Sequence, residues 1–255
     1  AHCQPLAACL SIGMMSVDKT GIQGTRWTGS VPILIGAAIL VACGAPSPDV
    51  PAERASQSQE PTAPVIPAPG PIIVFLGDSL TAGFGLAAED ALPEQVASIL
   101  KTESIEVRVV NAGVSGDTTA NGLARFDWSV TAADADLVVV ALGANDYLMG
   151  IDPERVKQNL SEIIQKAKDN NIECILVDLQ PRSTLEEGSR DAAFAAIYPD
   201  LAAKFDLKYY SSLMSGVENQ PDLLQSDGLH PTAQGVRVMA ENLAQFLVPI
   251  IETYE

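Results

Sequence analysis

The chain has 255 residues, 47% of them hydrophobic and 18% charged, a balance typical of a globular protein and not of a disordered one. Its length predicts one domain of about 150–200 residues with extensions. The formal net charge of −17 and the lack of a Lys/Arg cluster argue against nucleic acid as a partner, because phosphate binding needs clustered basic side chains. We attribute the acidity to solubility, with selection of a cationic substrate as the alternative.

Residues 1–43 are predicted to be a targeting segment. Met14 is a candidate start, as is the methionine after it, so residues 1–13 would lie upstream of the true beginning. A basic stretch precedes the apolar run Val31–Val41, which is shorter than the roughly 20 residues that a membrane-spanning helix needs. This pattern is typical of a cleaved signal peptide.

The apolar run ends in Leu-Val-Ala-Cys, with the cysteine at Cys43. These four residues resemble a bacterial lipobox, in which the cysteine becomes the lipidated first residue of the mature protein. A lipid anchor on Cys43 would hold the protein at a membrane of the bacterial cell envelope, on the periplasmic side, without a transmembrane helix. The alternative is an ordinary signal peptide that is cleaved nearby.

Residues 44–71 are predicted to be a disordered linker. They hold eight of the chain's 17 prolines, with Ser, Gln, Glu and Ala between them and no apolar periodicity. Such a segment would separate residues 72–255, the predicted globular domain, from a membrane surface.

From residue 72 onward, short apolar runs alternate with helical patterns. The runs suit parallel strands buried on both faces, and they occupy Ile72–Leu76, Val107–Asn111, Leu137–Leu142, Ile175–Leu179 and, more weakly, Leu207–Tyr210. Helices are predicted at about 90–101, 119–128, 153–169, 190–204 and 232–248. Pro153 and Pro231 would lie in first helical turns, where proline is tolerated. The alternation predicts an α/β fold, a three-layer sandwich around a parallel sheet.

Cysteine and histidine are too scarce for a metal or disulfide framework. Of the four cysteines, only Cys174 lies beyond Cys43, so the domain cannot form an internal disulfide. Thiolate and imidazole ligands are nearly absent, which argues against a metal site.

Four polar clusters lie at predicted strand ends or in the late loop that would face them. Gly77–Leu80, Gly113–Thr118 and Leu142–Asp146 follow the first three runs, and Asp227–Pro231 precedes the last helix. In open parallel sheets, sites form at the carboxyl ends of the strands. We therefore expect these clusters to meet.

Ser79 is a candidate nucleophile because Gly77 permits a sharp turn that presents the serine at the top of the sheet, although Gly-Asp-Ser is also ordinary turn chemistry. The chain contains no Gly-x-Ser-x-Gly nucleophile elbow. His230 is the only histidine besides His2, and Asp227 precedes it by three residues. This spacing lets a carboxylate hold one imidazole nitrogen while the other faces a serine.

The two middle clusters are candidate oxyanion-binding elements. The small residues of Gly113–Thr118 let backbone N–H groups approach a developing oxyanion, but the segment could equally be a loop in which Asp117 or Thr118 caps the next helix. The Asn145 amide is a good neutral donor, and an Asn/Asp turn is its alternative.

Together and in this order, the four clusters resemble the GDSL family, also called SGNH hydrolases. Ser79, Gly116, Asn145 and His230 match the family's block residues, and the resemblance runs from about Ile72 to the C-terminus. It looks closest to the bacterial arylesterase and multifunctional thioesterase/protease/lysophospholipase branch. The stretches that carry this are Val110–Thr119, Gly122–Arg125, Phe194–Pro199 and Asp227–Thr232.

The resemblance implies a flavodoxin-like five-stranded sheet and a serine ester hydrolase without a cofactor. Ser79 would attack the acyl carbonyl, His230 would take its proton, and Asp227 would orient His230. The backbone N–H groups of Ser79 and Gly116 and the Asn145 amide would bind the oxyanion. Small-molecule aryl or alkyl esters are the expected substrates, with thioesters and lysophospholipids as extensions, and no protein partner is predicted.

Two stretches bear on acyl specificity. Asp178–Thr184 should line the acyl pocket, but it lacks the Gly-Met and paired prolines expected from close relatives, so no chain length is predicted. Tyr147, Leu148 and Met149 follow the Asn-Asp pair. Either they border the pocket, or Leu148 and Met149 are packing residues.

Two other functions compete with the esterase. One is an O-deacetylase of envelope carbohydrate, and the other is a catalytically idle binding module of the envelope. Retention of all four blocks and of the Asp-x-x-His pair favours the esterase, since function is argued from the site and not from the fold.

Overall fold

The computed structural model describes residues 70–179 and 189–254. The predicted targeting segment, Cys43, nearly all of the linker and part of the Asp178–Thr184 loop lie outside these ranges. In the described ranges, no helix is both long enough and apolar enough to cross a bilayer.

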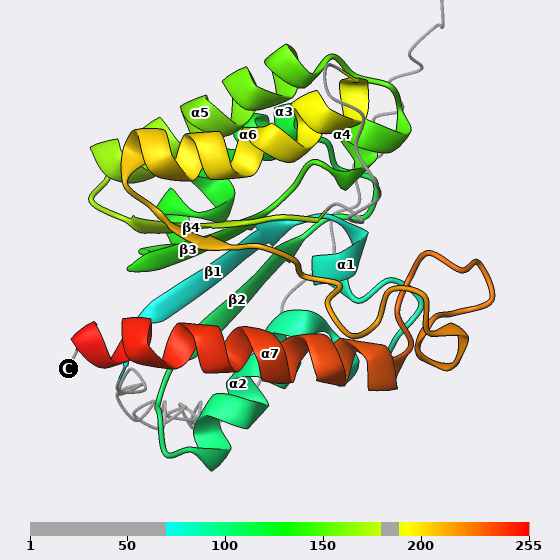
Figure 1. Cartoon of the computed structure of the whole chain (residues 1–255). Helices are drawn as coiled ribbons and strands as arrows, with labels where there is room; N and C mark the ends of the chain where they lie inside the picture. The colour runs from blue at the N-terminus through cyan, green and yellow to red at the C-terminus, as the bar shows by residue number, and fades with distance from the viewer. Residues whose placement is uncertain (1–69, 180–188, 255) are drawn as a thin grey trace, which may run out of the picture. The chain divides into compact units, whose positions relative to one another are not determined.

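The core of the domain is a parallel sheet of five strands (Figure 1). Their order across the sheet is β2-β1-β3-β4-β5, and every neighbouring pair is parallel. The strands are β1 (Ile72–Gly77), β2 (Arg108–Gly113), β3 (Leu137–Ala141), β4 (Glu173–Val177) and β5 (Lys208–Tyr210). β1 and β3 are buried along their whole length, whereas the edge strands β2 and β5 are partly exposed.

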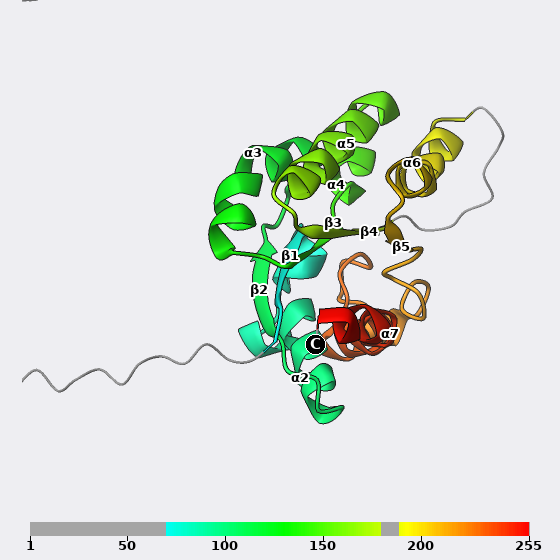
Figure 2. The same cartoon turned by 90° about the vertical axis from the view of Figure 1, so that its left-hand side faces the viewer.

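Helices cover both faces of this sheet. They are α1 (Ser79–Ala82), α2 (Leu92–Thr102), α3 (Thr119–Ser129), α4 (Ala144–Leu148), α5 (Pro153–Asp169), α6 (Arg190–Phe205) and α7 (Ala233–Ile251), with 3-10 turns at Ala88–Asp90, Thr131–Ala133, Pro221–Leu223 and Glu252–Tyr254. α2 and α7 pack on one face, and α3, α5 and α6 on the other, as both views show (Figures 1 and 2). The predicted three-layer α/β sandwich is therefore confirmed.

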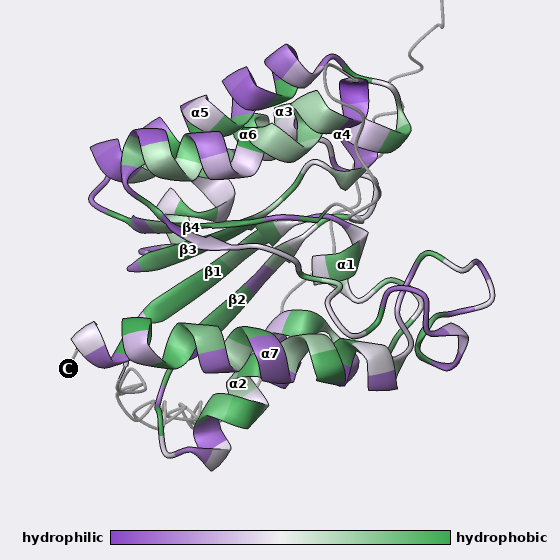
Figure 3. Cartoon of the chain, in the orientation of Figure 1, coloured by the Kyte–Doolittle hydropathy of each residue, from purple (hydrophilic) through white to green (hydrophobic). Residues whose placement is uncertain are grey.

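Hydrophobic patterning explains why the helices lie on the sheet. Apolar side chains recur along α5 at helical spacing and are buried, among them Val156, Leu160, Ile163 and Ala167. Asp152 caps this helix and Pro153 is its first residue, as expected for a first-turn proline. Figure 3 shows the same division, with hydrophobic colour along β1 and hydrophilic colour on parts of the helices turned to solvent.

Three details differ from the prediction. Strand ends shift by one or two residues: β4 runs from Glu173 to Val177 instead of Ile175–Leu179, and β2 runs on to Gly113. Pro231 does not lie in α7: the helix begins at Ala233 after an N-cap at Thr232, and Pro231 instead forms an isolated antiparallel bridge with Leu224. The short helices α1 and α4 were not predicted, since four or five residues cannot show a periodic pattern.

Candidate active site

Strand register brings three of the predicted clusters to one edge of the sheet. Gly77, the last residue of β1, pairs with Gly113 of β2 on one side and with Ala141 of β3 on the other. The chain segments that follow these three residues must therefore leave the sheet side by side. The expectation that the clusters meet at the strand ends is confirmed.

Ser79 is the first residue of the short helix α1. Asp78 is its N-cap, and the Asp78 carboxylate accepts a hydrogen bond of 3.0 Å from the Leu80 N–H. Gly77 must be glycine, because a Cβ there would lie 1.9 Å from Oγ1 of Thr81. The simple turn considered from the sequence is thus a capped helical turn that presents the serine at the strand end.

A hairpin-like loop brings the imidazole to this serine. Nε2 of His230 lies 2.9 Å from Oγ of Ser79, across 151 residues of sequence, and Nδ1 lies 2.7 Å from Oδ2 of Asp227. Asp227 Oδ1 also accepts the backbone N–H groups of His230 and Leu229. These hydrogen bonds lower the pKa of Asp227 to about 2, and the backbone N–H of His230 makes the largest contribution. The structure therefore brings together the three predicted residues in a Ser–His–Asp chain.

The loop is fastened to the body of the domain by Gln225. Its backbone N–H donates to the carbonyl oxygen of His230 at 2.8 Å, and its Nε2 donates to the carbonyl oxygens of Phe84 and Pro231 at 2.8 and 2.9 Å. The Phe84 ring lies against the imidazole, with ring centroids 4.4 Å apart. Neither residue was singled out in the sequence, where nothing links Gln225 to a segment 141 residues earlier.

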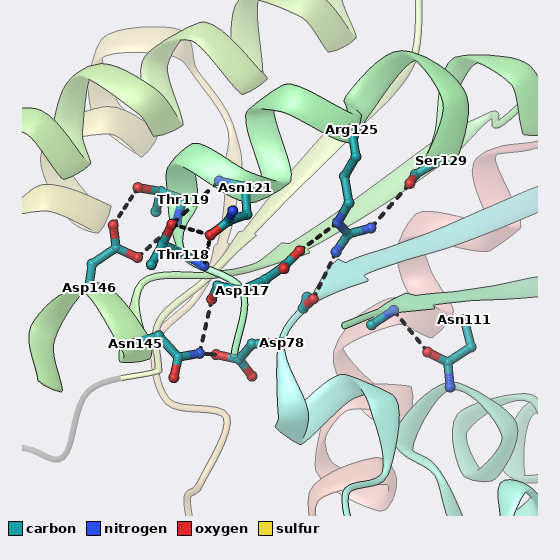
Figure 4. A network of polar contacts seen from close by, with 12 residues as sticks. Asp78, Asn111, Asp117, Thr118, Thr119, Asn121, Arg125, Ser129, Asn145 and Asp146 are labelled. Carbon is teal, nitrogen blue, oxygen red and sulfur yellow. Dashed lines mark hydrogen bonds and ion pairs between the residues drawn. The ribbon is translucent and has the colours of Figure 1, made fainter. Parts of the chain in front are cut away.

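Gly116 and Asn145 line the same cavity as Ser79 and His230. Gly116 has φ = 86°, and apart from its two chain neighbours no residue has an atom within 4 Å of where a Cβ would stand. Asn145 Nδ2 donates to the Asp117 carbonyl oxygen at 2.9 Å and lies 3.4 Å from Asp78 Oδ2 (Figure 4). Asn145 belongs to α4, so the Asn/Asp turn considered from the sequence is wrong. Thr118 does cap α3, as one of the two interpretations of this loop predicted.

Two buried carboxylates support this part of the site and were not predicted. Asp78 is 1% exposed, and burial raises its pKa to about 6. Asp146 is fully buried and accepts hydrogen bonds from the N–H and hydroxyl of Thr119, at 2.8 and 2.7 Å. Asn159 donates in turn to the Thr119 hydroxyl at 2.9 Å. Because Asp146 follows Asn145 directly, this anchor also holds the Asn145 amide in place.

The cavity beside Ser79 has a volume of about 470 Å³. Its lining includes many apolar side chains: Leu80, Phe84, Leu179, Met214, Leu224 and Leu229. Tyr147 and Leu148 also line it, whereas Met149 does not. Leu148 and Met149 are 62% and 69% exposed, so the interpretation of both as packing residues is wrong. The cavity is large enough for an acyl chain, and Ser79 and His230 lie in its wall.

No group of three or more His, Cys, Asp or Glu side chains that could hold a metal ion occurs within residues 70–179 and 189–254. The one cysteine in these ranges, Cys174, is a free buried thiol. Burial raises its pKa to about 12, so it is not a reactive thiolate.

Comparison with known proteins gives one consistent result. The model of the GDSL-like Lipase/Acylhydrolase family matches residues 75–238. Thioesterase 1/protease 1/lysophospholipase L1 of Escherichia coli (strain K12) is 36% identical over 180 residues, which are 70% of this chain and 84% of that protein. An arylesterase of Vibrio mimicus is 34% identical over 176 residues, 69% of this chain and 88% of its own.

A solved structure extends the similarity to three dimensions. The structure of AlinE4, an SGNH-hydrolase family esterase, aligns with a TM-score of 0.59 at 35% identity, covering 73% of this chain and 97% of that one. The matched region therefore spans nearly the whole of such a hydrolase.

Proposed function

The chain belongs to the GDSL-like lipase/acylhydrolase family, and we propose that its Ser79, His230 and Asp227 form a nucleophile, a base and an orienting carboxylate. It is a carboxylic ester hydrolase of the arylesterase, thioesterase and lysophospholipase type. The observation that carries the proposal is the 2.9 Å contact between Ser79 Oγ and His230 Nε2, backed by the 2.7 Å contact between His230 Nδ1 and Asp227.

In the acylation step, His230 Nε2 takes the hydroxyl proton as Ser79 Oγ attacks the acyl carbonyl carbon. The Asp227 carboxylate holds Nδ1–H and stabilises the imidazolium that forms. The imidazolium then gives the proton to the leaving oxygen or sulfur as its bond to the carbonyl carbon breaks. Water, deprotonated by His230, attacks the acyl-enzyme in the same way and releases the acid.

The tetrahedral intermediate needs hydrogen-bond donors for its oxyanion. We assign this role to the backbone N–H groups of Ser79 and Gly116 and to the side-chain amide of Asn145. The support is that all three residues line the cavity into which Ser79 faces. Asn145 Nδ2 donates to the Asp117 carbonyl oxygen at 2.9 Å and lies 3.4 Å from Asp78 Oδ2, so the oxyanion would replace the longer of these two contacts.

Small-molecule esters with an apolar acyl group are the substrates that suit the cavity, because most of its lining is apolar around a polar catalytic end. Thioesters and lysophospholipids are the proposed extensions. We propose no cofactor, since each step uses a group of the chain itself.

For the location we propose an exported protein: a signal peptide over residues 1–43, a lipid anchor on Cys43 and a linker over 44–71 that precedes the hydrolase domain of 72–255. The support is the apolar run that ends in Leu-Val-Ala-Cys. Metabolic labelling with a fatty acid should mark the wild-type chain and spare Cys43→Ala. Equal labelling of both would contradict the anchor.

The function is tested by hydrolysis of p-nitrophenyl esters from acetate to palmitate, with Ser79→Ala as the control. Turnover that disappears in Ser79→Ala supports the proposed nucleophile, and the chain-length profile separates an arylesterase from a lipid-directed enzyme. A folded wild-type protein without turnover on any ester would contradict the proposal and would direct attention to carbohydrate O-deacetylation or to binding alone.

A further inference from the structure

Three separate segments that follow strand ends supply the proposed oxyanion donors; they are called loops below, although those with Ser79 and Asn145 begin the short helices α1 and α4. Ser79 follows β1, Gly116 follows β2 and Asn145 follows β3. An oxyanion hole works only if its donors keep fixed distances from one another, because misplacement by an ångström is costly. The sheet aligns the strand ends, but something beyond the sheet must hold the loops to one another.

Arg125, on α3, contacts the first two of these loops directly (Figure 4). Its side chain is buried, and each of its three guanidinium nitrogens has a partner. Nε donates to Oδ2 of Asp117 at 2.6 Å, one Nη donates to the carbonyl oxygen of Gly77 at 3.0 Å, and the other donates to Oγ of Ser129 at 3.1 Å.

The third loop is reached through Asp117. This residue adjoins Gly116, its carboxylate pairs with Arg125, and its carbonyl oxygen accepts the Asn145 amide at 2.9 Å. Gly77 precedes Ser79 by two residues, and its carbonyl oxygen also accepts the Val114 N–H at 3.0 Å. One guanidinium therefore joins the strand end before the nucleophile to the loop that carries the second donor and holds the third.

We propose that Arg125 is a positioning residue that sets the geometry of the oxyanion hole through Gly77 and Asp117. The inference rests on the proposed roles of Ser79, Gly116 and Asn145. Arginine suits this task because its planar fork donates in several fixed directions at once, whereas the ammonium of lysine would reach fewer of these partners. The Arg125–Asp117 ion pair is largely buried. Replacing such a pair by apolar packing is often neutral for stability, whereas removing one partner alone leaves the other charge unpaired, so stability must be measured beside activity.

The test separates positioning from structural support by kinetics. The full-length protein carries Arg125→Lys, Arg125→Gln or, as a matched control, Asp127→Asn. Asp127 lies on the same helix but forms an exposed ion pair with Lys166. For each variant, kcat and KM are measured with p-nitrophenyl butyrate, together with the Ki of butylboronic acid, which adds to a serine as a tetrahedral mimic of the intermediate.

In the Arg125 variants we expect kcat to fall by about 10- to 100-fold while KM stays within about twofold, because an oxyanion is stabilised only in the transition state. The Ki of the boronate should rise in parallel with the loss of kcat/KM. Arg125→Lys should retain more activity than Arg125→Gln, since the lysine ammonium can still pair with the Asp117 carboxylate. Asp127→Asn should behave as wild type.

A wild-type kcat in folded Arg125→Lys would overturn the proposal, as would a change in KM alone or an unchanged boronate Ki. If Arg125→Gln does not fold, the lysine variant decides. Failure of the proposed function gives a different pattern, because Ser79→Ala would then retain the activity of the wild type whatever the Arg125 variants do.

Discussion

The two sides of the cavity differ in how deeply their carboxylates are buried. Asp146, on the Asn145 side, is fully buried and links α4 to α3 through its hydrogen bonds from Thr119. The Asp227 side chain, which contacts the imidazole of His230, lies on a loop and is 41% exposed. The Asn145 side, to which we assign oxyanion binding, is thus a network of buried polar groups that join α3, α4 and the end of β1. The imidazole side is a short loop held by backbone hydrogen bonds and by Gln225.

This difference separates two tasks within one site. Groups on the buried side contribute to folding as well as to geometry, because an unpaired polar group there has no access to water. Groups on the loop side are those to which we assign the proton transfer, and we expect them to contribute little to folding. Substitutions on the two sides should therefore change activity and stability in different proportions.

The largest expected effect on activity is that of His230→Ala. We expect kcat to fall by about 10⁴-fold or more, since His230 Nε2 is the group in hydrogen-bond contact with the Ser79 hydroxyl. The free energy of unfolding should change by less than about 1 kcal/mol, because Asp227 keeps its two backbone donors. Steady-state kinetics and urea unfolding check both numbers. A large loss of stability would break the comparison.

On the buried side, Asp146→Ala should show the reverse proportion. It leaves the N–H and hydroxyl of Thr119 without their acceptor in a buried position, so the free energy of unfolding should fall by about 2–4 kcal/mol. The matched control is Asp200→Ala, which removes an exposed ion pair with Lys157 and should cost less than about 1 kcal/mol. Equal losses in urea unfolding would contradict the division.

The pKa values of Asp78 and Asp227, the two carboxylates nearest the Ser79–His230 pair, are shifted in opposite directions, so the two should affect stability in opposite ways as the pH changes. Burial raises the pKa of Asp78 from 3.8 to about 6, so its contribution to stability is complete below pH 3.8 and is lost as the pH rises toward 6. Hydrogen bonds lower the pKa of Asp227 from 3.8 to about 2, so its contribution is present above pH 3.8 and is lost as the pH falls toward 2.

Unfolding measured from pH 4 to 7 isolates the Asp78 contribution when wild type is compared with Asp78→Asn. The stability of the wild type relative to the variant should fall by up to about 3 kcal/mol over this range. The asparagine retains an oxygen for the Leu80 N–H, so the helix cap is preserved. A difference that does not change with pH would show that Asp78 titrates normally.

The smallest expected effect is that of Gln225→Ala on the loop side. It removes two side-chain hydrogen bonds to carbonyl oxygens of Phe84 and Pro231, so kcat/KM should fall by about 3- to 10-fold as the imidazole becomes less well placed. Asn242→Ala, which removes one surface hydrogen bond to the Ser215 carbonyl, is the control and should have no effect. A loss of kcat/KM as large as that of His230→Ala would show that the position of the imidazole depends entirely on the Gln225 side chain.

Much of the fold could be predicted because it follows from local patterns. The apolar runs and the helical periodicity indicated five parallel strands and five long helices, with ends that differ by a few residues from those observed. Helices of four or five residues, such as α1 and α4, carry too little periodicity to be predicted. Pro231 was misplaced because a proline before an N-cap reads like a proline inside the first turn.

The candidate base and its carboxylate could also be named from the sequence alone. His230 is the only histidine of the predicted domain, and Asp227 precedes it by three residues. What only the tertiary structure decided is the support behind them: Arg125 joined to Gly77 across 48 residues, Thr119 to Asp146 across 27, and Gln225 to Phe84 across 141. Acidic, amide and guanidinium side chains of this kind occur all along the chain and are usually solvated. Each acquires its role here because folding places one particular partner within hydrogen-bond distance, and for Arg125 and Asp146 folding also removes the side chain from water.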